Sequence, residues 1–484
     1  MRFNFKVIFN ILGLLLMLNG LFMLLCLPVS YYFIDHNWTS LISSGSISIF
    51  TGFITWYLTR KSESKELRKR DGYLIVTLGW ITMSLFGTLP YLISGSIPLF
   101  TDAFFETISG FTTTGATILN EIEQMPPSIL FWRSLTQWIG GMGIIVLAVA
   151  ILPFLGIGGM QLFVAEAPGF SPDKLQPRIR ETAKRLWLIY VGLTALEIVL
   201  LKLGGMSYFD AFNHGLTTMA TGGFSTKQES IAYFSSPFIQ YIIIVFMFLG
   251  GTNFTLIYFG LKGRFRSIWR NEEYRTYTWG IIITALIVTV VVFGGSGEDF
   301  EESFRYSLFQ VVAIITTTGY VTADYTSWAP FATVLFLVLM FFGASAGSTS
   351  GGVKIVRHLI LLKNSFLELK RQLHPSGIIP VRLNGKAIPP DINFNILAFI
   401  MIYITIFATG SILMAMMGVE FETAIGAVAA TLGNVGPGIG AVGPASNYAD
   451  IPLIGKWLLA FFMLVGRLEL FTVLILFTPH YWQK

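Results

Sequence analysis

The fold is decided by a segment that recurs four times, first as FTDAFFETISGFTTTG between Phe100 and Gly115. It returns as YFDAFNHGLTTMATGG ending at Gly223, as FRYSLFQVVAIITTTG ending at Gly319 and as FETAIGAVAATLGNVG ending at Gly436. Each copy is short and mostly apolar, and closes on a Thr/Asn-x-Gly triplet. The four glycines lie roughly 100 residues apart, which predicts a repeated module of helix, half-helix, polar strand and helix.

An apolar stretch of about ten residues is too short to cross a bilayer and predicts a re-entrant half-helix. The Thr/Gly strand that follows cannot be helical, because glycine is flexible and adjacent threonines are stiff at χ1. Non-helical backbone persists at membrane depth only where it is buried in protein or lines a water-filled path. Four such strands around one axis would present rings of carbonyls to a monovalent cation, and the carbonyl ends of the half-helices would favour that cation. The alternative is four surface loops that happen to contain Thr and Gly.

The rest of the chain has the composition of a polytopic membrane protein. Of its 484 residues, 54% are hydrophobic and 12% are charged, whereas a soluble chain carries about 25% charged residues. This excludes disorder, a nucleic-acid-binding arm and an ordinary cytosolic enzyme. Apolar runs of spanning length predict ten spans, at 7–32, 41–58, 73–93, 130–152, 186–203, 238–261, 277–293, 332–362 (interrupted), 396–417 and 453–477.

The charged loops predict how the chain is oriented. Basic residues gather in the loops 60–70, 174–185, 262–275 and 354–386, which follow every second span. The positive-inside rule makes these loops and both termini cytoplasmic. The opposite side carries acidic residues, Asp102, Glu106 and Glu422 among them, and an acidic mouth would raise the local cation concentration. The plain alternative is that these loops simply lack Lys and Arg.

The four modules resemble the membrane–P-loop–membrane repeats of the Trk/Ktr/HKT superfamily of cation transporters. The similarity covers residues 71–484, and the stretches 137–143 (QWIGGMG) and 343–352 (GASAGSTSGG), with Gly466-Arg467, also contribute to it. The expected fold is an all-α polytopic membrane protein with four pseudo-symmetric helix–P-loop–helix repeats around one pore and an N-terminal two-helix hairpin. The domains are then a hairpin at 1–70 and repeats at 71–170, 171–270, 271–375 and 376–484.

The resemblance also implies which residues form a selectivity filter for K⁺. They are the last four residues of each recurrence: Thr112, Thr113, Thr114, Gly115, Ala220, Thr221, Gly222, Gly223, Thr316, Thr317, Thr318, Gly319, Gly433, Asn434, Val435 and Gly436. Only the final glycine is common to all four, and the fourth copy has asparagine where the others have threonine. The sites are therefore less uniform than in a symmetric channel, and we expect a moderate preference for K⁺ over Na⁺.

The eighth span is interrupted by ten residues of Gly, Ser, Ala and Thr, which are poor helix formers and leave backbone groups unpaired. Such a stretch is costly in lipid and must face the central cavity. We expect a mobile gate next to the filter, with Arg467 and these loop residues: Gly343, Ser345, Gly347, Ser348, Thr349, Gly351 and Gly352. The alternative is a close-packing interface of small residues between helices.

Arg467 lies within the apolar run 457–477, about ten residues from either end. In a continuous helix it would be roughly 15 Å from each interface, where an arginine costs about 3 kcal/mol on insertion scales. Glu469 is two residues away and is a poor intrahelical partner. Arg467 is therefore expected either as a positive barrier in the cavity beside the gate, or as a structural clamp on carboxylates or carbonyls of another module.

The function predicted from these features is K⁺ uptake across the bacterial inner membrane by channel-like permeation, with no bond made or broken and no organic cofactor. The superfamily implies a homodimer and a cytoplasmic, nucleotide-binding, TrkA-like regulatory subunit. The basic loops also suit anionic membrane lipids, and no nucleic-acid partner is expected. One rival is a secondary active K⁺ symporter coupled to H⁺ or Na⁺, which needs an ionisable residue at mid-membrane, for which Arg467 is the clear candidate.

A membrane-embedded enzyme is the second rival. It would need convergent nucleophile, acid or metal groups, and the five histidines are scattered along the chain. The single cysteine, Cys26, excludes an intrachain disulfide and a Cys-rich zinc site. His214, within the second half-helix, is expected as a structural hydrogen-bonding group and not as a catalyst.

Overall fold

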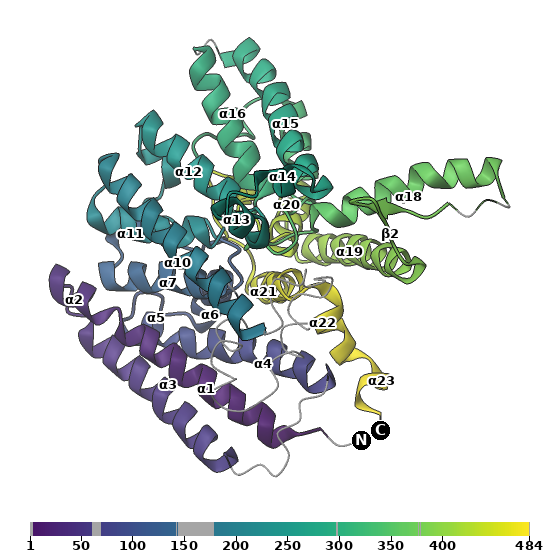
Figure 1. Ribbon diagram of the computed structural model, residues 1–484. Coiled ribbons are helices and arrows are strands. Elements are labelled where there is room, and N and C mark those ends of the chain that lie inside the picture. Colours follow the sequence, from purple (N-terminus) through teal and green to yellow (C-terminus); the bar gives the residue numbers. More distant parts are fainter. Residues whose placement is uncertain are drawn as a thin grey trace.

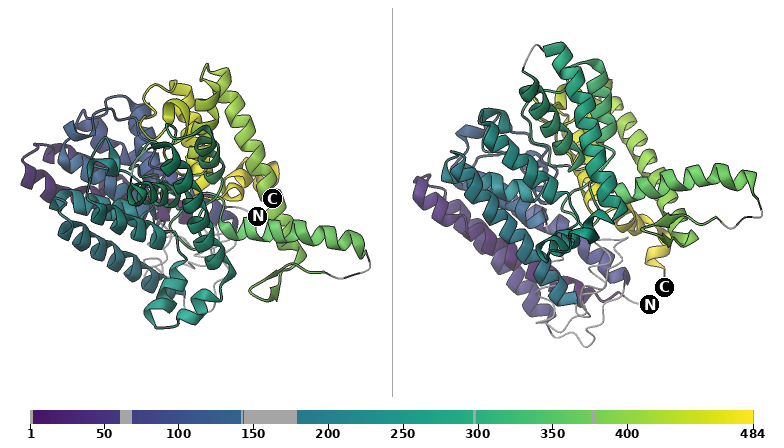
Figure 2. Two further views of the ribbon diagram at one scale, coloured as in Figure 1. Left: turned by 90° about the horizontal axis from the view of Figure 1, so that it is seen from above. Right: turned by 45° about the horizontal axis from the view of Figure 1, so that its top comes forward.

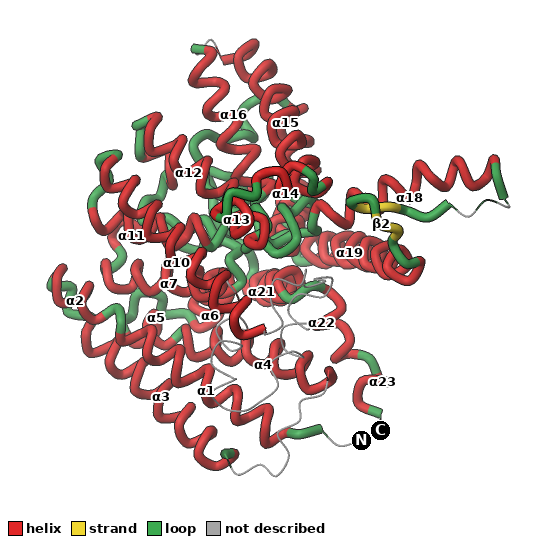
Figure 3. Tube along the Cα trace, in the orientation of Figure 1, coloured by secondary structure: helices red, strands yellow, loops and turns green. Residues whose placement is uncertain are grey.

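A computed structural model describes residues 3–60, 69–141, 143, 179–296, 299–375, 377 and 379–483. Helices dominate this part of the chain, and one two-stranded hairpin joins two of them (Figure 3). The basic loop 60–70 falls largely outside the described residues, as do residues 174–178, the end of the span predicted at 130–152 and the boundary between the first two repeats. Residues 179–185, predicted as part of a basic loop, are helical. The chain forms the all-α membrane fold that the sequence predicts.

The N-terminal part is a hairpin of α1 (Phe5–Leu24) and α3 (Trp38–Thr59), joined through α2 (Leu27–Phe33). Glycines allow the two long helices to touch. A Cβ at Gly13 would lie 2.7 Å from the Gly52 carbonyl oxygen, and one at Gly20 would lie 2.6 Å from that of Gly45. Small residues at such contacts are how membrane helices approach closely without a hydrophobic driving force.

After the hairpin, one order of elements recurs: a long helix, a short helix, an irregular strand and a further helix (Figure 1). The first set is α4 (Lys69–Gly87), α5 (Leu89–Ile93), α6 (Phe100–Phe111), η1 (Ile122–Gln124) and α7 (Pro127–Gly141). The second set is α10 (Ile179–Leu203), α11 (Tyr208–Met219), η3 (Ser230–Tyr233), α12 (Pro237–Gly250), α13 (Phe254–Leu261) and α14 (Phe265–Trp269).

The third set is α15 (Glu272–Ser296), α16 (Phe300–Ile315), α17 (Pro330–Leu339), α18 (Ile355–Leu373), β1 (Arg382–Leu383) and β2 (Lys386–Ala387). The fourth is α19 (Pro390–Met416), α20 (Phe421–Leu432), η4 (Gly440–Val442), α21 (Leu453–Arg467), α22 (Leu470–Leu474), η5 (Ile475–Phe477) and α23 (Pro479–Trp482). Helix α18 projects away from the bundle in both views of Figure 2. The two chain ends lie together, where the Tyr481 hydroxyl donates to the Arg70 carbonyl at 2.6 Å.

Within the described residues, six helices are long and apolar enough to cross a membrane, and two bent helix pairs bring the number to eight if each pair is one span. Two of the ten predicted spans were wrongly taken as continuous. The run 238–261 bends by 108° between α12 and α13, and the run 453–477 bends by 116° between α21 and α22. Apolar periodicity cannot reveal these bends. The first follows Gly250 and Gly251, where Asn253 caps the new helix by accepting from the Thr255 amide, and the second occurs where Glu469 has φ of 56°.

Candidate functional site

The four predicted half-helices α6, α11, α16 and α20 all end with the same backbone geometry. The helix cap is followed by a residue in the left-handed conformation, with φ between 52° and 56°: Thr113, Thr221, Thr317 and Asn434. In the first copy the Thr113 amide donates to the Gly110 carbonyl and the Thr114 amide to the Ser109 carbonyl, both at 2.9 Å. The same pair of bonds closes the other three helices. This is the Schellman ending, which turns the chain sharply out of a helix.

Three of these left-handed positions are occupied by threonine. A β-branched residue rarely adopts positive φ, and such a conformation costs about 1–3 kcal/mol and persists only where the surroundings enforce it. Asparagine tolerates it much better. Asn434, the only one of the four residues at this position that is not threonine, therefore suits a backbone conformation that strains the threonines.

The four final glycines form a closed ring. Each has positive φ, and a Cβ on it would overlap a carbonyl oxygen of the next copy. Gly115 faces the Gly222 carbonyl, Gly223 that of Thr318, Gly319 that of Val435, and Gly436 that of Thr114. The chain therefore runs round one axis in sequence order and returns to its start. The sixteen predicted filter residues are buried or half-buried, which contradicts the alternative of four surface loops.

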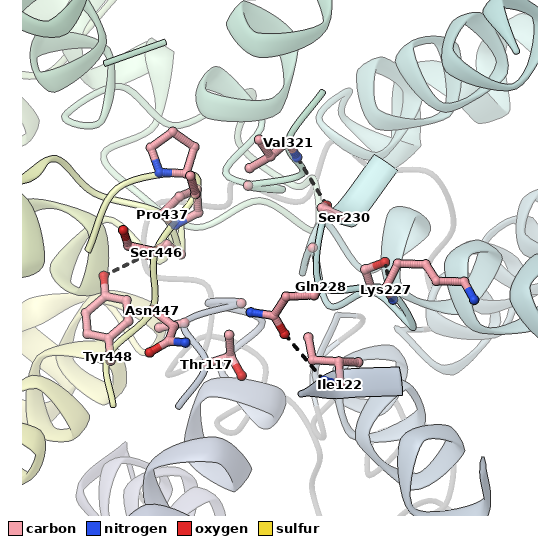
Figure 4. A pocket seen from close by; sticks show the side chains of 18 of the residues that line it. Thr117, Ile122, Lys227, Gln228, Ser230, Val321, Pro437, Ser446, Asn447 and Tyr448 are labelled. Carbon is pink, nitrogen blue, oxygen red and sulfur yellow. Dashed lines mark hydrogen bonds between the residues drawn. The ribbon is translucent and has the colours of Figure 1, made fainter. Parts of the chain in front are cut away.

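A cavity opens at the glycine end of this ring (Figure 4). All four glycines line it, together with residues that follow each of them, among them Thr117, Ser225, Val321 and Pro437. Lys227 also belongs to its lining. Its ammonium group, however, lies 4.4 Å from the centre of the Tyr233 ring, and in Figure 4 the side chain extends outward from the cavity. The other charged residue of the lining, Arg133, is paired with Glu106.

At the opposite, helical end of the ring lies the loop 340–354. Helix α17 ends at Leu339 and α18 begins at Ile355, so the predicted interruption of this span is confirmed. Thr349 Oγ1 donates to the Met219 carbonyl at 3.0 Å, and the Gly351 amide donates to Thr317 Oγ1 at 2.6 Å. A Cβ on Gly351 would lie 2.6 Å from Cβ of Asn434. The loop thus touches the second, third and fourth segments where they leave their helices.

Arg467 is not in the middle of a continuous helix, as its sequence position suggested, but at the C-terminal end of α21, where a positive charge complements the helix dipole. Its guanidinium donates to the carbonyls of Gly140 and Gly141 at 2.6 and 3.0 Å and to that of Thr349 at 2.7 Å. It therefore joins the end of α7 to the loop 340–354. Glu469 is not its partner and forms an ion pair with Arg357 of α18.

Glu106 does not lie at an acidic mouth, as its place among the acidic residues predicted. Its side chain is fully buried behind the first segment, on the inner face of α6. It forms an ion pair with Arg133 at 2.6 Å and accepts from the Ile118 amide at 3.0 Å. Arg133 in turn donates to the Ser225 carbonyl at 2.9 Å. The pair therefore fixes the strands that leave the first two segments.

Aligning the copies on their final glycine would have revealed this position. It holds Glu106, His214, Gln310 and Ala427, each nine residues before the glycine. The His214 ring contacts Ser225 Oγ at 2.9 Å, and Gln310 donates to Thr322 Oγ1 at 3.3 Å. In three of the four copies, a polar side chain of the half-helix thus contacts the strand beyond the glycine. His214 makes these contacts as the structural hydrogen-bonding group that its sequence position suggested.

A further anchor comes from Gln137. Its amide donates to the Gly222 carbonyl at 2.6 Å and accepts from the Phe224 amide at 3.0 Å. Gly222 has no side chain of its own, and a Cβ there would fall on the Gln137 amide. The second segment is therefore held by a side chain from the preceding module, a contact that pattern analysis of the segment alone does not show.

Comparison with known proteins gives matches over nearly the whole chain. The TrkH family model, described as "Cation transport protein", matches residues 40–484. The Trk system potassium uptake proteins TrkH of Salmonella typhimurium and of Escherichia coli K12 are each 42% identical over 486 residues, which cover 99% of this chain and 100% of the relative. The crystal structure of the potassium transporter TrkH from Vibrio parahaemolyticus is 39% identical, with a TM-score of 0.89 over 99% of this chain and 100% of that one.

Proposed function

Because the chain belongs to the TrkH family of cation transport proteins, which are transporters and not enzymes, we propose that it takes up potassium by channel-like permeation through the glycine ring. As a multi-pass membrane protein it would act in the bacterial inner membrane. The relatives are named for potassium uptake by a Trk system, and K⁺ is accordingly the ion that we assign to this chain.

The observation that carries the proposal is the closed ring of four glycines, each against the carbonyl of the next segment. Backbone carbonyls at such close quarters can replace the hydration shell of a monovalent cation. The helices α6, α11, α16 and α20 all direct their C-terminal, partially negative ends at the ring. We assign ion binding to the residues 112–115, 220–223, 316–319 and 433–436.

The loop 340–354 and Arg467 are proposed as the gate. The loop lies at the helical end of the ring and holds the hydroxyl of Thr317 through the Gly351 amide. The Arg467 fork ties the loop to α7 through three carbonyls, and a fixed positive charge beside the path repels K⁺. Release of the loop from Arg467 would then remove the obstruction.

The wider assembly is also a proposal. We assign the two-helix hairpin to residues 1–70 and the four pore repeats to 71–170, 171–270, 271–375 and 376–484, with both termini cytoplasmic. The name Trk system, which the relatives carry, implies more than one component. We therefore propose a homodimer that binds a cytoplasmic, nucleotide-binding, TrkA-like regulatory subunit.

The ring is tested by Gly223→Ser in reconstituted vesicles, with K⁺ and Na⁺ fluxes measured in parallel. The new Cβ would meet the Thr318 carbonyl oxygen in a left-handed conformation, so we expect the K⁺/Na⁺ permeability ratio to fall about tenfold or more. Gly280→Ser is the matched control, because a Cβ at Gly280 meets nothing within 4 Å. An unchanged permeability ratio in Gly223→Ser, at normal membrane level, would refute the filter assignment.

The gate is tested by Arg467→Ala. Loss of the bonds to Gly140, Gly141 and Thr349 should free the loop and raise basal K⁺ flux several-fold. Arg467→Lys keeps the charge but cannot reproduce the planar fork, so its flux should lie between those of the parent and the alanine variant. If Arg467→Ala instead reaches the membrane at normal levels and conducts no K⁺, the arginine is a structural clamp and not a barrier.

A further inference from the structure

Helix α10 carries a glutamate in the middle of its apolar sequence, which the sequence analysis did not single out. The Glu197 side chain is 0% exposed. Among the described residues, neither of its carboxyl oxygens meets the geometry of a hydrogen bond, and no ion pair includes it. An ionised carboxylate buried without a partner is very costly, and an ionisable residue inside a membrane helix marks a candidate functional position.

The surface that faces Glu197 belongs to α11, the half-helix of the second segment. The two helices lie side by side (Figure 1) and pack against each other. Gly215 of α11 lacks a side chain where Ile198 comes against it, and a Cβ there would lie 2.5 Å from Ile198 Cγ1. Ile198 directly follows Glu197, and the polar side chain of α11 that lies near the Glu197 carboxyl is Thr218.

The Thr218 hydroxyl has a single proton, and that proton already has two acceptors. It is directed at the His214 carbonyl at 2.7 Å and at the Tyr320 hydroxyl at 3.3 Å. What remains on the oxygen is acceptor capacity. An ionised carboxylate offers only acceptors and would face the hydroxyl oxygen without a proton between them, whereas a protonated carboxyl offers the donor that the site lacks.

The same hydroxyl leads on to the ring. Thr218 Oγ1 lies 3.3 Å from the hydroxyl of Tyr320, the residue that directly follows Gly319. Tyr320 is fully buried, and its hydroxyl also lies 2.5 Å from Thr217 Oγ1. Thr218 and Tyr320 therefore link the helix of the second segment to the strand of the third, and a hydrogen bond from Glu197 to Thr218 would extend this link to α10.

We propose that Glu197 is a positioning residue for the filter. As a neutral carboxylic acid, and after rotation about its own side-chain torsions, it donates a hydrogen bond to Thr218 Oγ1. This bond holds the second and third segments in register through Tyr320. The proposal rests on the function proposed above for these segments. It assigns to Glu197 no contact with the ion and no transfer of protons during transport.

The test compares Glu197→Gln with Glu197→Leu in reconstituted vesicles. The amide of glutamine can donate to Thr218 as the protonated acid does, so Glu197→Gln should keep the parent K⁺/Na⁺ permeability ratio and flux. Leucine has similar bulk but no donor, and the ratio should fall by about three- to tenfold, the range that one hydrogen bond supports. The infrared C=O stretch of a protonated carboxyl, present in the parent, should disappear in Glu197→Gln.

Thr218→Val removes the same interaction from the filter side and serves if Glu197→Leu does not accumulate in the membrane. Its control is Thr194→Val, in α10, which loses a partly buried hydrogen bond from the Trp138 indole at 3.2 Å that involves none of the four segments. An unchanged K⁺/Na⁺ permeability ratio in Thr218→Val would overturn the proposal. A Glu197→Gln variant as impaired as Glu197→Leu would also overturn it, and would indicate a carboxylate that must ionise, as in a proton-coupled symporter. If Gly223→Ser also leaves selectivity unchanged, the filter assignment itself has failed.

Discussion

The first and fourth segments of the ring have the same backbone path but different anchors. Behind the first, the fully buried Glu106 pairs with Arg133 and holds the outgoing strand by its amide. The fourth has Ala427 at that position, and its strand is held from the other side by the Tyr448 hydroxyl, which donates to the Gly436 carbonyl at 2.7 Å. The helix ending dictates the path, and each repeat fixes that path with its own side chains.

Asn434 adds a second difference. Its amide donates to Thr114 Oγ1 and to the Met463 carbonyl, both at 2.9 Å. The first of these bonds crosses directly to the first segment, so the side chain closes the ring where its two ends meet. The fourth segment is thus held by neutral hydrogen bonds, one of which crosses to the first segment, whereas the first is held by a buried charge pair within its own module.

The largest effect is expected from breaking the charge pair with Glu106→Gln. Arg133 would keep its charge in a buried site without its counterion, and removing one partner of such a pair costs about 3–5 kcal/mol. Thermal unfolding in detergent should report this loss. Glu121→Gln, at an exposed position, should change stability by less than about 0.5 kcal/mol. Equal stability of the Glu106 variant and the parent would mean that the pair does not hold the first segment.

Asn434→Thr should have the next largest effect. It gives the fourth segment the residue of the first three, but places a β-branched side chain at φ of 53° and removes both amide bonds. We expect a loss of about 2 kcal/mol and a lower K⁺/Na⁺ ratio.

The control for Asn434→Thr is Asn447→Thr at the cavity rim. Asn447 also donates two side-chain hydrogen bonds, to Leu119 and Asn120, but its φ is not positive. The difference between the two variants therefore reports the left-handed backbone together with the deeper burial of the Asn434 bonds. If both lose the same stability, the conformation at Asn434 carries no strain and the comparison with the three threonines fails.

The smallest effect is expected from Tyr448→Phe, which removes one hydrogen bond to the Gly436 carbonyl. A loss of about 1 kcal/mol is typical of a single bond, together with a modest fall in the permeability ratio. Tyr481→Phe removes a bond of similar length to the Arg70 carbonyl, at the chain ends, and should cost similar stability with no change in selectivity. Equal selectivity in the two variants would show that the hydroxyl of Tyr448 does not position the ring.

These contrasts explain what the sequence could predict. The recurring glycines and the threonine triplets are local patterns that follow from backbone conformation, so the half-helices, the broken span at 343–352 and the four strands were all predictable. Anchors such as Arg133 for Glu106, or Gln137 for Gly222, join residues that are 27 and 85 positions apart. No periodicity predicts which distant side chain completes such a contact.

The same limit applies to charged residues and bends. Glu106 belongs to a half-helix on the side of the chain where acidic residues gather, which suggested an acidic mouth. Its side chain is buried because of the orientation of α6 about its own axis, which the sequence does not show. Arg467 was placed at mid-membrane because the run 453–477 is apolar throughout. The 116° bend after it depends on a backbone conformation at Glu469 that composition does not signal.

The most direct test of the account is a map of ion density. Rubidium scatters anomalously and resembles potassium in size and charge, so crystals of the protein grown in Rb⁺ would reveal where a permeant cation binds. We predict anomalous peaks on the axis enclosed by Gly115, Gly223, Gly319 and Gly436, coordinated by backbone carbonyls of the four segments. Rb⁺ density away from this axis, with none inside the ring, would contradict the claim that the glycine ring is the path of the ion.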